Sequence, residues 1–277
     1  MQIDIKEKLK KYADSNEKIS SMFFIDKINS SKQTFEVYTL VEDVIISKMQ
    51  EELEEIFDDI ILINKRKGYF KVDKKTQQYT KFEIYMKDSS KLIENIVSED
   101  LALDFIQNLN RKLNFIYDKN ALEEKITQED VEYKRARDFE FENCIRNFYA
   151  EALDISFYLL ERNNISALVK MEKLRSELLN MVNWHLIEKF SRKKDMGDNG
   201  ENLKYTLEAE DYEILEETFS CAKIEEIYKS LFKACQLFRK LGLDLSEKLS
   251  YPYLKKEDVD SMKILRHNYK KIESILL

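Results

Sequence analysis

The feature that most constrains the fold of this chain is a change in hydrophobic spacing near residue 90. Before that point, short runs of β-branched and aromatic residues alternate with polar stretches, which is typical of strands. After it, apolar residues recur about every 3.6 positions, which is typical of helices that bury one face. Only four glycines and one proline occur among 277 residues, so a loop-rich or all-β protein is disfavoured. The pattern predicts an α+β domain followed by a helical domain.

The first part of the chain predicts a small sheet with helices at about 3–18 and 47–57. The expected strands are residues 21–25, 34–41, 59–64, 69–72 and 79–86. Short basic runs occur at 65–67, 74–75 and 192–194. They lack the interleaved aromatic residues of an RNA-binding strand, so we interpret them as solvated turns.

The second part of the chain predicts a bundle of amphipathic helices. One expected helix, residues 98–109, precedes the bundle, and the expected helices of the bundle are residues 141–162, 165–190, 209–219, 223–241 and 256–275. We expect helix ends at Asn163-Asn164 and at Gly242, since glycine readily adopts the left-handed conformation that follows a helix. The charged segment 120–137 is expected to run between the domains, which places the sheet domain at 1–137 and the bundle at 138–277.

Composition narrows the class of protein and the partners it can have. The formal net charge is −7, which disfavours nonspecific binding to nucleic acid and mildly favours a cationic partner. The three cysteines lie far apart without metal-ligand spacing, so we expect buried thiols. The N-terminus lacks the apolar core of a signal peptide, and the longest apolar runs are too short to span a membrane. These observations predict a cytoplasmic protein without a membrane segment.

Two carboxylates are the strongest candidates for chemistry. Strand side chains alternate between faces, so Glu36 and Glu83 each point away from their apolar neighbours. If their strands are adjacent and in register, the two carboxylates meet on one face of the sheet. Such a pair would suit Mg²⁺, which prefers oxygen ligands. The alternative is that both are ordinary solvent-facing strand residues.

Two other features admit a functional and a structural interpretation. The stretch 197–205 (GDNGENLKY) contains glycines, but its acidic residues would repel phosphate, so a helix–helix connection is the simpler interpretation. Trp184, the only tryptophan, stands next to His185 late in a predicted helix. Either residue could contact a ligand, while core packing for the tryptophan and a polar surface contact for the histidine are the alternatives.

The helical half resembles the streptomycin (aminoglycoside 6-) adenylyltransferases. The resemblance lies in residues 141–149 (FENCIRNFY), 178–186 (LLNMVNWHL), 218–220 (TFS), 227–232 (IYKSLF), 237–239 (LFR) and 251–252 (YP), in that order. It implies a nucleotidyltransferase-fold N-terminal domain with a mixed sheet, followed by a helical bundle. It also implies transfer of AMP from Mg-ATP to a hydroxyl of a cationic aminoglycoside.

The same resemblance implies roles for named residues and exposes several departures. Glu36 and Glu83 would hold the metal and serve catalysis, Lys27 or Lys204 would lie near the phosphates, and Trp184 and His185 would line the acceptor site. However, the family's Asp-x-Asp reads Thr-Phe-Glu at 34–36, and its upstream Gly-Ser is replaced by Ile-Asp-Lys-Ile at 25–28. Two family lysines in the stretch 197–201 have become acids, and the acid before Trp-His is Asn183.

These departures predict a weakly active or inactive homologue, because several lost contacts to metal and phosphate act together. Two alternatives stay open. One is a non-catalytic protein that binds a ligand or partner through the cleft between the two domains, where the family binds its substrates. The other is a transferase with a changed nucleotide or acceptor.

Overall fold

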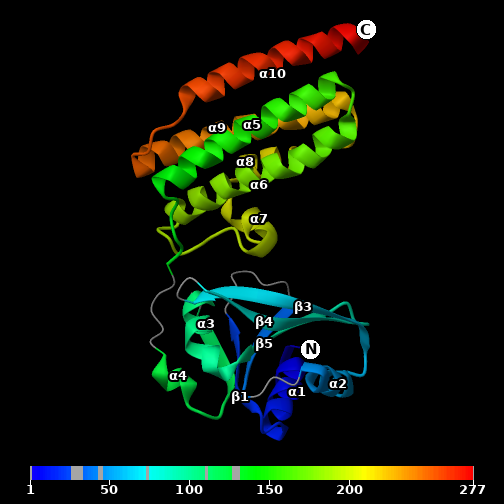
Figure 1. Cartoon of the computed structure of the whole chain (residues 1–277), viewed down its shortest axis with the longest axis vertical. Helices are drawn as coiled ribbons and strands as arrows, with labels where there is room; N and C mark the ends of the chain where they lie inside the picture. The colour runs from blue at the N-terminus through cyan, green and yellow to red at the C-terminus, as the bar shows by residue number, and fades with distance from the viewer. Residues whose placement is uncertain are drawn as a thin grey trace. The chain divides into compact units, whose positions relative to one another are not determined.

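The computed structural model describes residues 2–25, 34–42, 46–72, 75–109, 112–126 and 132–276. The chain divides into two compact units, Met1–Val131 and Glu132–Leu277. Figure 1 shows the strands in the first unit and the long helices in the second. Within the described ranges, no helix is long and apolar enough to cross a membrane.

The first unit is built on a six-stranded sheet with the order β3-β4-β5-β2-β1-β6. The strands are β1 (Ile19–Ile25), β2 (Thr34–Val41), β3 (Ile60–Val72), β4 (Lys75–Met86), β5 (Lys91–Ser98) and β6 (Leu113–Asp118). The β2–β5 pair is parallel and the other neighbours are antiparallel. The mixed sheet predicted from the family resemblance is therefore confirmed.

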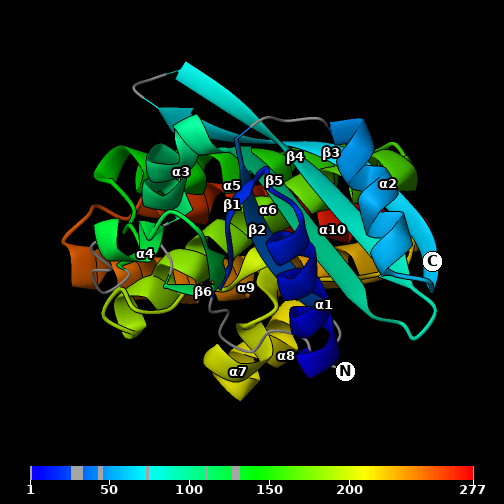
Figure 2. The same ribbon diagram turned by 90° about the horizontal axis from the view of Figure 1, so that it is seen from below.

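Helices cover both faces of this sheet. Helices α1 (Gln2–Ser15) and α2 (Ile46–Ile56) lie on one face, as Figure 2 shows from below. They pack on it through Leu9 and Leu53. Helix α3 (Ala102–Leu109) packs on the other face, where Phe105 meets Tyr38. The short elements η1 (Glu99–Leu101) and α4 (Leu122–Lys125) complete the unit. The residues of β2 therefore alternate between two separate apolar cores.

Three expectations for the sheet were wrong. The strands β5 and β6 were not predicted, because residues after 90 were assigned to helices. Strand β5 is buried along most of its length, so its sequence shows no alternation of apolar and polar residues. The two strands expected at 59–64 and 69–72 form the single strand β3, and the basic run 65–67 lies inside that strand instead of in a turn.

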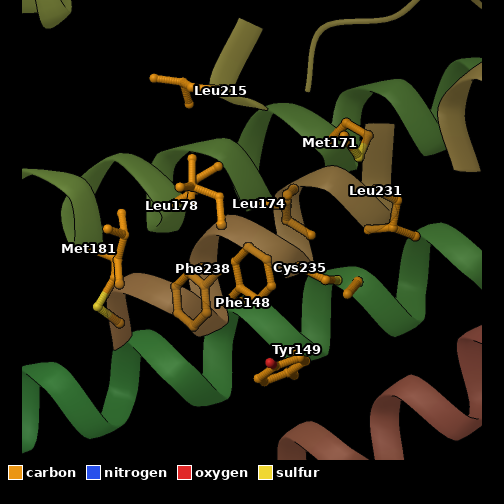
Figure 3. Close-up of a cluster of buried hydrophobic side chains, with 14 of the residues drawn as sticks. Phe148, Tyr149, Met171, Leu174, Leu178, Met181, Leu215, Leu231, Cys235 and Phe238 are labelled. Carbon is orange, nitrogen blue, oxygen red and sulfur yellow. The ribbon is translucent and has the colours of Figure 1, made fainter. Parts of the chain in front are cut away.

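The second unit is a helical bundle. Its helices are α5 (Asp138–Leu160), α6 (Asn164–Lys189), α7 (Leu203–Thr206), α8 (Ala209–Glu216), α9 (Ile224–Leu249) and α10 (Lys255–Leu276), with the short turn η2 (Asp198–Gly200). In the core, the rings of Phe148 and Phe238 stack with their centroids 3.8 Å apart, as Figure 3 shows. Cys144 and Cys235 are buried as expected, whereas Cys221 is exposed.

One of the two predicted helix ends is correct. Asn163 caps α6 by accepting a hydrogen bond from the Ser166 amide. Gly242 does not end a helix, because α9 continues through it to Leu249. A Cβ atom at Gly242 would lie 2.9 Å from Cε2 of Tyr253, so this glycine allows the close approach of an aromatic ring.

Candidate active site

Glu36 and Glu83 lie on the same face of the sheet, but their strands are not neighbours. Strand β5 runs between β2 and β4, and Ile93 pairs with Glu36 on one side and with Glu83 on the other. Paired residues point to the same face, so these three side chains form one row with the isoleucine at its centre. Two strand spacings separate the carboxylates, roughly 10 Å between their Cα atoms. The adjacency on which the predicted pair depended is therefore absent.

Glu83 is held by cationic and amide groups of the neighbouring strands. Its Oε1 lies 2.7 Å from Nζ of Lys91, and its Oε2 lies 2.8 Å from Nε of Arg66. The Asn64 amide donates a further hydrogen bond of 3.1 Å to Oε2. Glu83 is only 8% exposed, and its hydrogen bond with Lys91 lowers the pKa of its carboxyl below the ordinary value. Both carboxylate oxygens are thus occupied by donors from the protein.

The partners of Glu36 on β2 and β5 are neutral. Its Oε1 accepts hydrogen bonds from the Tyr38 hydroxyl (2.9 Å) and from the Asn95 amide (3.1 Å). Asn95 also donates to the carbonyl oxygen of Val37, which ties the side chain to the backbone of β2. Glu36 is therefore positioned by β2 and β5, at a distance from the cations that surround Glu83.

The row of Glu36, Ile93 and Glu83 does not fit a magnesium centre. An ion ligated by both carboxylates needs oxygen atoms about 2 Å from the metal on each side. The position beside Glu36 on the adjacent strand is apolar, and the second carboxylate already neutralises Arg66 and Lys91. Across the described ranges, no group of three or more Asp, Glu, His or Cys side chains is arranged to hold a metal ion.

A third carboxylate, Glu94, follows Ile93 and points to the opposite face of the sheet. It is fully buried, and Thr39 donates a hydrogen bond of 2.9 Å to its Oε1. Its Oε2 has no hydrogen-bond partner among the described residues, and burial raises the pKa of Glu94 to about 7. Because it lies on the face covered by α1 and α2, it cannot join the row that contains Glu36.

The two lysines predicted near phosphate have different outcomes. Lys27 lies outside the described residues. Lys204 lies in the single-turn helix α7 with an exposed side chain. The preceding loop is a connection between α6 and α7, as predicted, and Gly197 and Gly200 adopt φ values of +76° and +78° that favour glycine.

Trp184 lines a shallow hollow of about 570 Å³ in the helical unit. The other lining residues are Lys134, Arg135, Arg137, Arg192 and Glu140. Each arginine has a carboxylate partner, so that Arg135 lies 3.0 Å from Glu188 and Arg192 lies 2.7 Å from Glu132. With these pairs and that of Arg137 with Glu140, the surroundings of the hollow are close to charge-neutral, so their charge selects neither a cationic nor an anionic ligand.

His185 lies in different surroundings from Trp184, because consecutive helical residues differ in direction by about 100°. Its Nδ1 lies 2.8 Å from Oδ2 of Asp244 on α9. Burial lowers the pKa of His185 below its ordinary value, partly offset by that carboxylate. Asn183, one position before Trp184, accepts a hydrogen bond from the Met196 amide and so ties the loop between α6 and α7 back to α6. The histidine thus contacts α9 and is not among the residues that line the hollow.

Sequence reasoning missed the groups that surround the two carboxylates. Arg66 and Lys91 neutralise Glu83, Asn95 orients Glu36, and Ile93 separates the two. They were missed because β5 was not predicted, and this strand supplies three of these four residues. The apolar, β-branched stretch KLIENIVS bounded by Asp88 and Ser89-Ser90 was the available indication of a buried strand.

Comparisons with known proteins agree with this architecture. A family model described as "Streptomycin adenylyltransferase" matches residues 28–268. An aminoglycoside 6-adenylyltransferase of Bacillus subtilis is 28% identical over 80% of this chain and 79% of its own length. A second one, from Staphylococcus aureus, is 24% identical over 87% of this chain and 88% of its own. The crystal structure of an aminoglycoside 6-adenyltransferase from Bacillus subtilis has a TM-score of 0.50 and 25% identity, covering 96% of this chain and 97% of that one.

Proposed function

Because this chain belongs to the streptomycin adenylyltransferase family, we propose that it is a homologue that transfers AMP weakly or not at all. The observation that supports this most strongly is the row of Glu36, Ile93 and Glu83. An adenylyltransferase needs carboxylates that converge on a metal beside the triphosphate. Here an apolar side chain occupies the middle of the row, and one of the carboxylates is bound to two cations.

The sequence departures act in the same direction as this geometry. Thr34 stands where the family resemblance places the first metal carboxylate, and acids replace two lysines in the stretch 197–201. Removal of one preorganised contact to a transition state can cost on the order of 10²- to 10³-fold in rate. Several such losses together leave the family's reaction with little support.

The charge around the hollow beside Trp184 can be compared with the charge of the acceptor molecule that the relatives use. The relatives are named as aminoglycoside 6-adenylyltransferases, and aminoglycosides are polycations. The three arginines of the lining are paired with Glu188, Glu140 and Glu132, so the hollow has no excess of carboxylates that would attract such a ligand.

Calorimetric titration with ATP, with and without Mg²⁺, tests the proposal. The wild-type chain is compared with Glu36→Gln and Glu83→Gln, and the Bacillus subtilis relative serves as the positive control. We expect Mg²⁺-dependent ATP binding in the relative and none in this chain. Incubation with labelled ATP and streptomycin should give product at a rate at least about 10³-fold below that of the relative.

Mg²⁺-dependent binding that both substitutions abolish would refute the proposal and identify Glu36 and Glu83 as working ligands. Repeating the titration with GTP, CTP and UTP tests the alternative of a changed nucleotide. Tight, Mg²⁺-dependent binding of one of these would support that alternative instead. Circular dichroism of each variant checks that a loss of the calorimetric binding signal is not caused by a loss of folded structure.

A further inference from the structure

Helices α9 and α10 enclose a groove that the adenylyltransferase reaction does not explain. Phe232, Cys235, Gln236 and Arg239 contribute from α9, with spacings of three, four and seven residues that place them on one helical face. From α10, Met262, Arg266, Tyr269, Lys270 and Glu273 have the same kind of spacing. The groove has a volume of about 580 Å³, within the range of small-molecule sites.

The two helices are held together around the groove and leave it open between their contacts. Arg239 donates a hydrogen bond of 2.6 Å to Asp258 at the start of α10. Eleven residues further along α10, the ring of Tyr269 packs against Phe232, with centroids 5.8 Å apart. Helix α10 otherwise packs mainly on α5, as Figure 1 shows, so α9 does not fill this space.

The groove combines an apolar floor with cationic sides. Met262 and Cys235 are buried at its base, and the half-buried rings of Phe232 and Tyr269 form one end. Such a lining favours the apolar or aromatic body of a ligand.

Arg266 and Lys270 supply the charge that selects the ligand. Both side chains are exposed, and among the described residues neither forms an ion pair within 4 Å. Asp258 is engaged by Arg239, and Glu273 is the carboxylate that lines the groove. Arg266 and Lys270 outnumber it, so a net positive charge borders an apolar surface, which is the arrangement that recognises one acidic group joined to an apolar body.

We propose that the groove between α9 and α10 binds an amphipathic small-molecule anion, with its apolar body on Phe232 and Tyr269 and its acidic group at Arg266 and Lys270. The adjoining hollow toward the start of α9 is lined by Glu225 and Glu226 and also by Lys229 and Lys233. Its charges balance, so it offers no excess of cations for a second anionic group, and the ligand class is a monoanion.

Fluorescence titration of the full chain with 8-anilinonaphthalene-1-sulfonate tests this proposal. The probe is an aromatic monoanion of the predicted class. In the double variant Arg266→Gln/Lys270→Gln, we expect its dissociation constant to rise about tenfold, because two charged contacts to the sulfonate are lost. Decanoate should displace the probe, whereas decyltrimethylammonium should not.

Lys255→Gln/Lys256→Gln is the matched control. It makes the same charge change on exposed residues of the same helix, outside the groove. We expect its dissociation constant to change less than about twofold. Equal weakening in both double variants, equal displacement by the two amphiphiles, or no probe binding would each overturn the proposal. Thermal melts of both variants separate binding to the groove from probe binding to a loosened bundle.

Discussion

The substitution Glu83→Gln distinguishes an ion-paired structural residue from a metal ligand. In the wild-type protein the carboxylate neutralises Lys91 and Arg66 at 2.7 and 2.8 Å. The amide of glutamine can accept from only one of them, and its NH₂ group then faces the other donor. We therefore expect the first unit to lose stability even in the absence of any metal.

The magnitude follows from the burial of the three side chains. The Arg66 side chain is 62% exposed, so its pair with Glu83 contributes about 0–1 kcal/mol. The Lys91 side chain is 25% exposed, and breaking its pair leaves a half-buried ammonium group, which costs roughly 1–2 kcal/mol more. We expect a total loss of about 1–3 kcal/mol, which corresponds to a decrease in Tm of roughly 3–10 °C for a unit of this size.

Two spectroscopic signals measured together report this loss. Thermal unfolding by far-ultraviolet circular dichroism follows both units, whereas the fluorescence of the single tryptophan, Trp184, follows the helical unit. The dichroism transition should move to lower temperature while the fluorescence transition stays in place.

The pKa of Glu83 is lowered in the folded state, so the stabilisation that its carboxylate provides is present above its unfolded pKa and is lost as the pH falls through the folded pKa. The difference between wild type and variant should therefore shrink in acid.

Glu36→Gln is the matched control, because Tyr38 and Asn95 are neutral donors that an amide oxygen can still satisfy. We expect a change below about 0.5 kcal/mol. Equal destabilisation by the two substitutions would refute the reasoning. So would a wild-type protein that Mg²⁺ stabilises while leaving both variants unaffected, since that result requires a shared metal.

The structure makes three further predictions. Burial raises the pKa of Glu94 from 4.5 to about 7 in the folded protein. The folded state therefore favours the protonated carboxyl, and this contribution to stability is present below pH 4.5 and is lost as the pH rises through 7. Urea denaturation at pH 5 and pH 8 should show that Glu94→Gln reduces this loss, which amounts to at most about 3 kcal/mol; an unchanged pH dependence would contradict it. Asp258→Asn should destabilise the bundle by about 2–4 kcal/mol, measured by tryptophan fluorescence in urea, because it leaves Arg239 without its carboxylate. Gly242→Val should cost about 1–3 kcal/mol by the same measurement, since its Cβ would lie 2.9 Å from Tyr253, and a neutral result would mean that the ring moves freely.

The sequence predicted the helices better than the strands, for a physical reason. A helix with one buried face repeats its apolar residues, so α5 and α6 were predicted within a few residues of their observed ends. Strand β5 is buried on both faces, and such a strand lacks the alternation that distinguishes it from a helix. Gly242 was misassigned because its role depends on the packing of Tyr253, a residue beyond the end of α9 whose contact with the helix the local pattern does not reveal.

The candidate site was predictable only as far as each strand could be considered alone. Alternation predicted that Glu36 and Glu83 each point away from their apolar neighbours, and it is the pairing of both with Ile93 that places them on one face of the sheet. Their separation depends on which strand lies between them, and that is a property of topology that one sequence does not reveal. The same holds for Arg66, whose partner lies on a neighbouring strand.

The row across β2, β5 and β4 has a consequence for how such a protein could change. A carboxylate introduced at Ile93 would stand between Glu36 and Glu83, at a position only 8% exposed. Without a bound cation, three neighbouring negative charges would repel one another, and the new one would also lose its hydration. A single substitution at Ile93 toward a metal centre therefore lowers the free energy of unfolding before it provides any catalytic activity. In evolutionary terms Ile93 hinders the recovery of a metal site, because the single substitution that would begin it makes the protein less stable.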